Sequence, residues 1–120
     1  MRRSLAAAAV LSVLVFAVPA NASAPPVGPL PAGPVTRISV QHGEYFAIAL
    51  PPLHGGGQVW RIARHYDGRV VTEVSESVLR DNVVAVFRAL RPGNATISYA
   101  VTVGERTKAL KARVFRVTVR

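Results

Sequence analysis

Seven short stretches in which apolar side chains alternate with other residues follow one another along this chain, with little room for helix between them. Alternation with a period of two is typical of a β-strand that buries one face. Turn signals separate the stretches, including Asp67-Gly68, Pro92-Gly93 and residues 104–107. This spacing predicts an all-β fold, an antiparallel immunoglobulin-like β-sandwich. The predicted strands are residues 36–40, 44–50, 58–64, 69–74, 83–90, 95–103 and 110–119.

The only tryptophan, Trp60, opens the third stretch, where many such sandwiches place a large core residue. We therefore predict that its ring belongs to the core and is not a binding platform. Residues 74–82 are ambiguous, because they suit either a short helical turn or a loop. The predicted inward-facing residues are Phe46, Ile48, Leu50, Trp60, Ile62, Ala85, Phe87, Ala89, Ile97, Tyr99, Val101, Phe115, Val117 and Val119.

The first 22 residues have the pattern of an export signal. Arg2 and Arg3 precede an almost unbroken apolar run, and small residues at 20–22 suit cleavage. Cleavage after Ala24 and an uncleaved anchor are the alternatives, although the run is shorter than the roughly 20 residues that a membrane span needs. We expect a secreted protein, or one of the periplasm or cell envelope, that meets the membrane only through this segment.

Five prolines follow in residues 23–35. This composition predicts an extended, disordered spacer between the export site and the domain. The sandwich domain is predicted to span residues 36–120.

The composition excludes several classes of chemistry. The chain has no Cys, so disulfides, thiol catalysis and thiolate metal sites are excluded. His42, His54 and His65 lack the spacing of a metal-binding pair, and the six Asp and Glu residues suggest no acid–base pair. The sequence His-Gly-Gly-Gly at 54–57 copies an oxyanion-hole motif of lipases, but no Gly-x-Ser-x-Gly motif accompanies it. We predict a protein that is not an enzyme and needs no cofactor or metal.

The chain is basic: its formal net charge of +9 becomes +7 without Arg2 and Arg3. The remaining cations are scattered along several predicted strands, which is typical of a solvated surface. The alternative is that these cations make electrostatic contact with anionic cell-wall or envelope polymers. No nucleic-acid-binding motif is present, so no specific nucleic acid is expected.

Residues 43–60 contain the candidate site. A strand that alternates up to Leu50 is ended by Pro51 and Pro52, because proline cannot donate to a sheet ladder. Three consecutive glycines follow, and a bare tip between two anchored strands suits close approach to another molecule. The alternative is a plain turn in which the glycines only permit positive φ. The predicted partner-binding loop consists of Leu53, His54, Gly55, Gly56 and Gly57, with Leu53 as the apolar anchor.

This stretch resembles the chagasin-type inhibitors of papain-like cysteine peptidases. Leu50, Pro51, Gly57 and Trp60 match the Leu-Pro, loop glycine and Trp of that family without a gap, and residues 87–97 look like the stretch before its penultimate strand. The resemblance covers about residues 40–119. It implies an immunoglobulin-like sandwich whose three loops at one end enter the cleft of a peptidase, without cleavage and without a cofactor.

The three loops themselves depart from the family. The Asn-Pro-Thr-Thr-Gly loop keeps only its last glycine, Gly57, and the glycine-rich second loop falls on residues 79–83, where no glycine stands. The resemblance places the third loop, Arg-Pro-Trp in the family, after Tyr99, where residues 100–104 lack both the proline and the tryptophan.

Residues 92–98 have a second resemblance, to the Pro-Gly-x-Ala-x-Ile turn of bacterial immunoglobulin-like repeats, which are adhesive or structural. The leading functional prediction is an exported, chagasin-like inhibitor of papain-like peptidases that acts as a monomer. The alternative is a non-inhibitory immunoglobulin-like domain that binds a partner of the cell envelope or cell surface.

Overall fold

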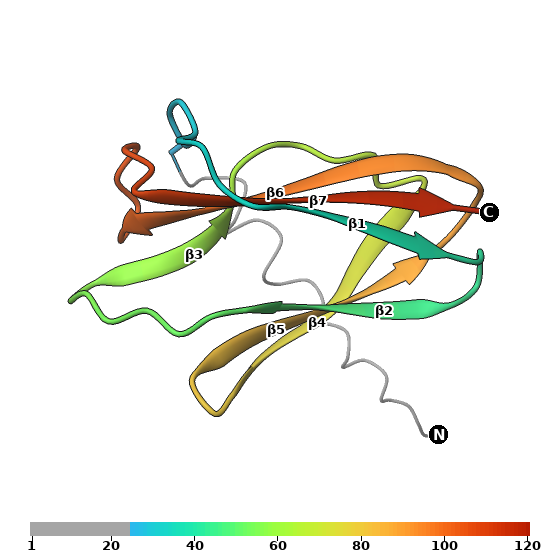
Figure 1. Cartoon of the computed structure of the whole chain (residues 1–120), viewed down its shortest axis with the longest axis horizontal. Helices are drawn as coiled ribbons and strands as arrows, with labels where there is room; N and C mark the ends of the chain where they lie inside the picture. The colour runs from blue at the N-terminus through green and yellow to red at the C-terminus, as the bar shows by residue number, and fades with distance from the viewer. Residues whose placement is uncertain (1–24) are drawn as a thin grey trace, which may run out of the picture.

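Two β-sheets pack face to face in the computed structural model of the protein, which describes residues 25–120 (Figure 1). One sheet has four strands in the order β1-β7-β6-β3, and the other has three in the order β2-β5-β4. The strands are β1 (Val35–Val40), β2 (Tyr45–Leu50), β3 (Gln58–Ile62), β4 (Val71–Leu79), β5 (Asn82–Ala89), β6 (Gly93–Val103) and β7 (Lys111–Val119). The predicted seven-stranded sandwich is confirmed. The predicted export signal lies outside the described residues, and no helix within residues 25–120 is long and apolar enough to cross a membrane.

One strand pair differs from the predicted antiparallel arrangement. β1 runs parallel to β7, with Val35 opposite Val114 and Val40 opposite Val119. All other pairs in the described residues are antiparallel. The reason is the route of the chain: after β1 it crosses at once to the other sheet, so β1 has no hairpin partner and lies along β7 instead.

The core lies between the sheets, where the residues of both inner faces meet. Phe87 is fully buried, with Phe46 stacked on it at 5.5 Å between ring centroids and Tyr66 edge-on at 5.8 Å. Of the predicted inward residues, Phe46, Trp60 and Ile62 pack against the core but are only partly buried. They belong to β2 and β3, each at the edge of its sheet, where the interior is less completely closed. The other predicted inward residues are buried.

Residues 74–82 form neither a helical turn nor a long loop. β4 continues to Leu79, and Arg80 and Asp81, with φ of 52° and 68°, form the two-residue turn into β5. Positive φ at both turn residues is the geometry of a type I′ hairpin. A register shift between Glu73 and Ser75 interrupts the alternation of β4. This irregularity hid the second half of the strand from the sequence pattern.

The segment of residues 25–34, here called the N-terminal strap, differs from the predicted disordered spacer because it is bonded to the domain. Arg61 donates to the carbonyl oxygen of Pro25 at 2.9 Å, and Arg64 donates to that of Val27 at 3.0 Å. The amide of Gly28 donates to the carbonyl of Thr107 at 2.7 Å. Val27 is 7% exposed. The strap is therefore bonded to β3 on one side and to the β6–β7 connection on the other. It covers the outer face of β6, which lies between these two attachments.

The strap explains why the second half of β6 is buried on both faces. Ala100 and Thr102 belong to its outer face, yet both are 0% exposed. Arg61 also donates from Nε to Thr102 Oγ1 at 3.0 Å and from Nη2 to the Arg106 carbonyl at 2.9 Å. Strap, β6 and the following loop are thus held together by one guanidinium group.

Candidate functional site

Three connections meet at one end of the sandwich, here called the loop end. They are the β2–β3 loop (residues 51–57), the β4–β5 turn at Arg80 and Asp81, and the β6–β7 loop (residues 104–110). Strand pairing places the β2–β3 loop beside both others, because Leu50 opposes Val83 next to the β4–β5 turn and Gln58 opposes Val103 next to the β6–β7 loop. Figure 1 shows all three at the left of the molecule. The loop end is therefore the place where a composite binding surface is available.

The β2–β3 loop projects its glycine tip into solvent. His54 and the three glycines are exposed, whereas Leu53 is partly buried. Gly57 has a positive φ of 73°, so a turn requirement accounts for this glycine. A Cβ on Gly56 would meet nothing within 4 Å. A Cβ on Gly55 would overlap the side chain of Gln58, so the missing side chain there makes room for the glutamine. The plain-turn alternative thus explains Gly57 but not Gly55 or Gly56.

Two hydrogen bonds hold this loop in place. Trp60 donates from Nε1 to the carbonyl oxygen of Pro51 at 2.9 Å, which fixes the start of the loop. The amide of Gly104 donates to the carbonyl of Gly57 at 2.8 Å, which joins the end of the loop to the β6–β7 loop. A loop bonded at both ends is preorganised, so its ordering costs little when a partner binds.

A groove of about 190 Å³ lies beside the candidate loop. Pro51, Pro52, Leu53 and Trp60 form one side of it. The rest is lined by the strap at Ala32, Gly33 and Pro34 and by β7 at Lys111, Ala112 and Arg113. Trp60 therefore has two roles, since it packs on the core and also lines this groove. Sequence analysis assigned it to the core alone.

The β4–β5 hairpin adds an apolar tip to the loop end. Val78 is 70% exposed and Leu79 is 63% exposed, directly before the turn. Side chains this exposed and this apolar at a hairpin tip are suited to contact with a partner. Sequence analysis placed a loop at residues 79–83 but did not single out these two residues. The available signal was the adjacent pair Val78-Leu79, which breaks the alternation just before the turn.

The family resemblance placed the third loop at residues 100–104. The strand pattern instead ended the strand at Val103 and predicted a turn at residues 104–107, and the structure agrees with the strand pattern. Residues 100–103 belong to β6, and Ala100, Val101 and Thr102 are fully buried. The loop begins only at Gly104, whose φ is 56°. The reason is the strap and Arg61, which cover the outer face of β6 and keep it paired as far as Val103. Residues 104–110 are the actual connection at the loop end.

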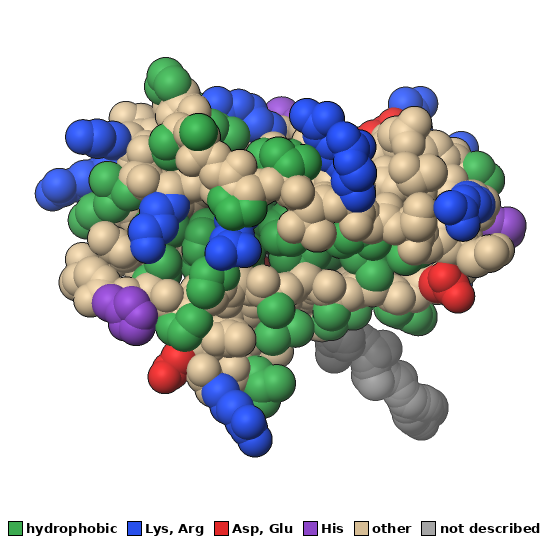
Figure 2. Space-filling model, viewed as in Figure 1, with side chains coloured by type: hydrophobic (Ala, Val, Ile, Leu, Met, Phe, Trp, Pro, Cys, Tyr) green, Lys and Arg blue, Asp and Glu red, His purple; other side chains and the backbone are tan. Residues whose placement is uncertain are grey.

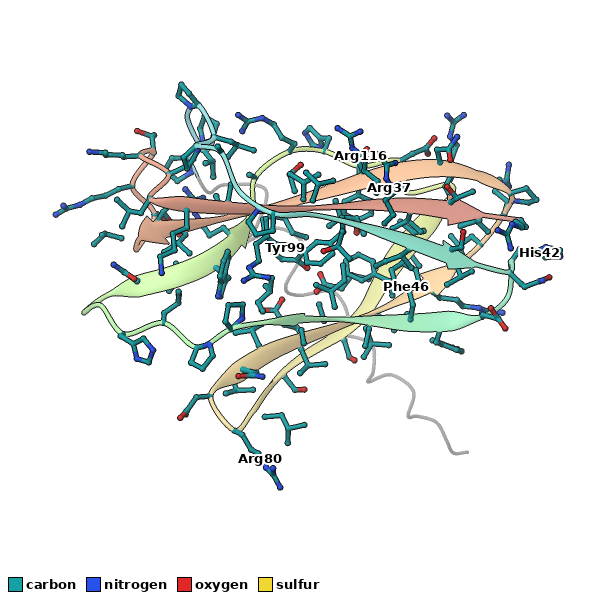
Figure 3. All side chains as sticks on the ribbon, in the orientation of Figure 1. Arg37, His42, Phe46, Arg80, Tyr99 and Arg116 are labelled. Atoms are coloured by element: carbon teal, nitrogen blue, oxygen red, sulfur yellow. The ribbon has the colours of Figure 1, made fainter. Side chains whose placement is uncertain are left out.

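The titratable groups with the largest shifts lie in the core, away from the loop end. Burial, reinforced by the nearby Glu76, raises the pKa of Glu73 to about 7. Burial also raises the pKa of Tyr99 well above its usual range, and to a lesser degree that of Tyr66. Glu73 Oε2 and the Tyr99 hydroxyl have no hydrogen-bond partner among the described residues. Figure 3 shows Tyr99 between the two sheets.

The groups exposed at the loop end are of the kinds that contact another protein. No group of three His, Cys, Asp or Glu side chains within residues 25–120 is arranged to hold a metal ion. The loop tips carry glycine backbone, the apolar side chains Leu53, Val78 and Leu79, and His54 as the exposed ring. Such a surface can fill a cleft in another protein.

Two solved structures share this fold, although no family model and no curated protein matches the chain. One is the cysteine protease inhibitor EhICP2 from Entamoeba histolytica, with a TM-score of 0.56 and 14% identity over 72% of this chain and 96% of that chain. The other is PbICP-C in complex with falcipain-2, with a TM-score of 0.56 and 14% identity over 80% of this chain and 98% of that chain. Both are chagasin-family inhibitors, so the fold that the sequence resemblance implied is confirmed.

Proposed function

We propose that this protein inhibits papain-like cysteine peptidases by inserting its loop end into the active-site cleft. The observation that supports the proposal most is the grouping of three connections at one end of a sandwich shared with two cysteine protease inhibitors. PbICP-C was solved in complex with falcipain-2, a papain-like cysteine peptidase. The protein would act as a monomer outside the cytoplasm, after removal of its export signal.

The β2–β3 loop is the central element of the proposed wedge. Its glycines let the backbone approach the floor of a narrow cleft, and Leu53 supplies the apolar anchor. Val78 and Leu79 contact one wall of the cleft, and residues 104–110 contact the other. Because Gly57 and Gly104 are hydrogen bonded, the central and third loops enter as one rigid unit. The contacts are therefore backbone and apolar contacts, in place of the Thr and Trp side chains of the family pattern.

A titration of the purified protein against papain and against a cathepsin L-type enzyme, with a fluorogenic peptide substrate, tests the proposal. We expect competitive inhibition and an intact inhibitor on a denaturing gel after prolonged incubation. A chain that is cut within residues 53–57 would be a substrate, which would contradict the proposal. Undiminished peptidase activity at micromolar inhibitor would also contradict it, and would favour the non-inhibitory envelope-binding alternative.

A further inference from the structure

A pair of arginines stands side by side on the outer face of the four-stranded sheet. Arg37 of β1 lies directly opposite Arg116 of β7, and Thr96 of β6 lies opposite Arg116 on its other side. All three side chains are exposed. Their neighbours in sequence, such as Ile38 and Val117, pack into the core, so these three face outward. Figure 3 shows Arg37 and Arg116 next to each other above the ribbon, on the side away from Phe46.

A row of smaller polar groups lies next to this pair. Ser39 opposes Thr118, and Thr118 opposes Asn94. Thr118 Oγ1 donates to Asn94 Oδ1 at 3.1 Å, and Arg120 Nη2 donates to Ser39 Oγ at 3.3 Å. Ser39, Asn94 and Thr118 line a shallow groove of about 340 Å³ together with Thr96 and the arginine pair. This groove is here called the outer-face groove.

No negative charge balances the two arginines. None of the residues that line the outer-face groove is acidic. The one ion pair among residues 25–120 joins Arg69 to Asp67, and neither Arg37 nor Arg116 donates to another described residue. Like charges directly opposite each other on a sheet are destabilising. A bound anion would offset that repulsion.

Several other arginines, unlike this pair, have partners within the protein. Arg61 and Arg64 donate to backbone carbonyls of the strap and its surroundings. Arg88 lies over the Tyr45 ring at 5.7 Å. Figure 2 shows Lys and Arg side chains spread over the visible face, with few acidic ones between them. Arg37 and Arg116 are distinguished by being adjacent and by having no structural partner.

We propose that the outer-face groove binds an acidic polysaccharide. A guanidinium group pairs with a carboxylate or sulfate through two parallel hydrogen bonds, so Arg37 and Arg116 would hold the charged groups of the polymer. Ser39, Thr96 and Thr118 would donate to and accept from sugar hydroxyls. No aromatic ring lines the groove, so the stacking platform that single-stranded nucleic acid requires is missing.

The groove and the loop end lie at different places on the sandwich. The groove uses the start of β6 and the end of β7, whereas the loop end follows the end of β6 and precedes β7. Both sites are therefore accessible at the same time. The inference does not depend on the proposed peptidase inhibition, and either one stands if the other fails.

Binding of heparin, polygalacturonate and neutral dextran to the full protein, measured by calorimetry at two salt concentrations, tests this inference. We expect both acidic polymers to bind, dextran not to bind, and affinity to fall as salt rises. The double variant Arg37→Gln/Arg116→Gln should lose at least tenfold in affinity. The matched control Arg80→Gln/Arg91→Gln, which removes the same charge elsewhere, should change it by less than threefold.

Three results would overturn the inference. An equal loss in both double variants would show that total charge alone attracts the polymer. If neither heparin nor polygalacturonate binds, the groove does not bind acidic polysaccharides. Tighter binding of a thymine oligonucleotide than of heparin would assign the groove to nucleic acid. Thermal unfolding of each variant excludes misfolding, and we expect the Arg37→Gln/Arg116→Gln variant to be no less stable than the parent, because a like-charge contact is removed.

Discussion

The amide of Gly104 donates a hydrogen bond of 2.8 Å to the carbonyl oxygen of Gly57. The two glycines belong to different loops, and both have positive φ, at 56° and 73°. Each lies in a conformation that residues with a Cβ adopt only at a cost. The bond therefore depends on glycine at both positions, and it makes two loops of the proposed wedge into a single structural unit.

The first prediction compares Gly57→Ala with Gly56→Ala. Gly57→Ala should lower the free energy of unfolding by about 1 kcal/mol, because its positive φ strains any residue with a Cβ. Gly56→Ala should leave stability unchanged or slightly raised, because its added methyl group meets nothing within 4 Å. Urea unfolding of the two variants measures this. Equal effects in both would show that the loop is not held in the described conformation.

The second prediction concerns Leu53 as the apolar anchor. Leu53→Ala should weaken peptidase inhibition by about tenfold, the effect of losing one buried apolar contact at an interface. It should change the melting temperature little, because Leu53 is already partly exposed. Leu90→Ala is the matched control, since Leu90 is 41% exposed and follows β5 at the opposite end. If both variants inhibit like the parent, the loop does not enter the cleft through Leu53.

The third prediction separates the two roles of Trp60. Trp60→Phe keeps an aromatic ring on the core but removes the donor to the Pro51 carbonyl, so it should cost about 1 kcal/mol of stability and weaken inhibition. Trp60→Ala should cost roughly 3 kcal/mol, because it also leaves a cavity. Thermal unfolding and inhibition assays on both variants give the comparison. Full inhibition by Trp60→Phe would show that the hydrogen bond does not position the loop.

The fourth prediction concerns pH. Burial and Glu76 raise the pKa of Glu73 to about 7, above the ordinary value of 4.5 for a glutamate. The folded state therefore holds a proton there that the unfolded state has released, and stability should fall as pH rises from about 4.5 to beyond 7. Glu73→Gln should remove this loss, which the partial exposure of Glu73 to solvent limits to roughly 2 kcal/mol.

Urea unfolding of the parent and of Glu73→Gln, at pH 5 and at pH 8, measures the difference. His42, His54 and His65 are present in both the parent and the variant, so any contribution from them is the same in both. The pH dependence that disappears on substitution therefore belongs to Glu73. Identical pH dependence in both proteins would show that the carboxyl is solvated in the folded state.

Much of the sandwich was predictable because its signals are local. Alternation from Phe46 to Leu50 marks a strand with one buried face, and Asp67-Gly68 and Pro92-Gly93 mark turns without reference to the rest of the chain. The position of the β2–β3 loop followed from Pro51 and Pro52, which end β2. The local sequence alone is therefore enough to locate the β2–β3 loop.

Other features that were missed depend on contacts between distant parts of the chain. Prolines in the strap indicate extended backbone but do not reveal that Arg61, 36 residues from Pro25, is bonded to it. The adjacency of Arg37 and Arg116 exists only because β1 is parallel to β7. No local sequence pattern predicts these contacts.

The parallel pairing of β1 with β7 also determines when this domain can finish folding. β1 is an edge strand bonded to β7 alone, and Ser39 and Arg120, which hydrogen bond across this pair, are 81 residues apart. Closing a loop of that length costs about 4 kcal/mol of chain entropy. During synthesis β1 leaves the ribosome long before β7, and it stays unpaired until β7 has also been synthesised. Truncation at the N-terminal side of the domain would therefore leave β7 as the edge strand, and truncation at the C-terminal side would leave β1 without a partner.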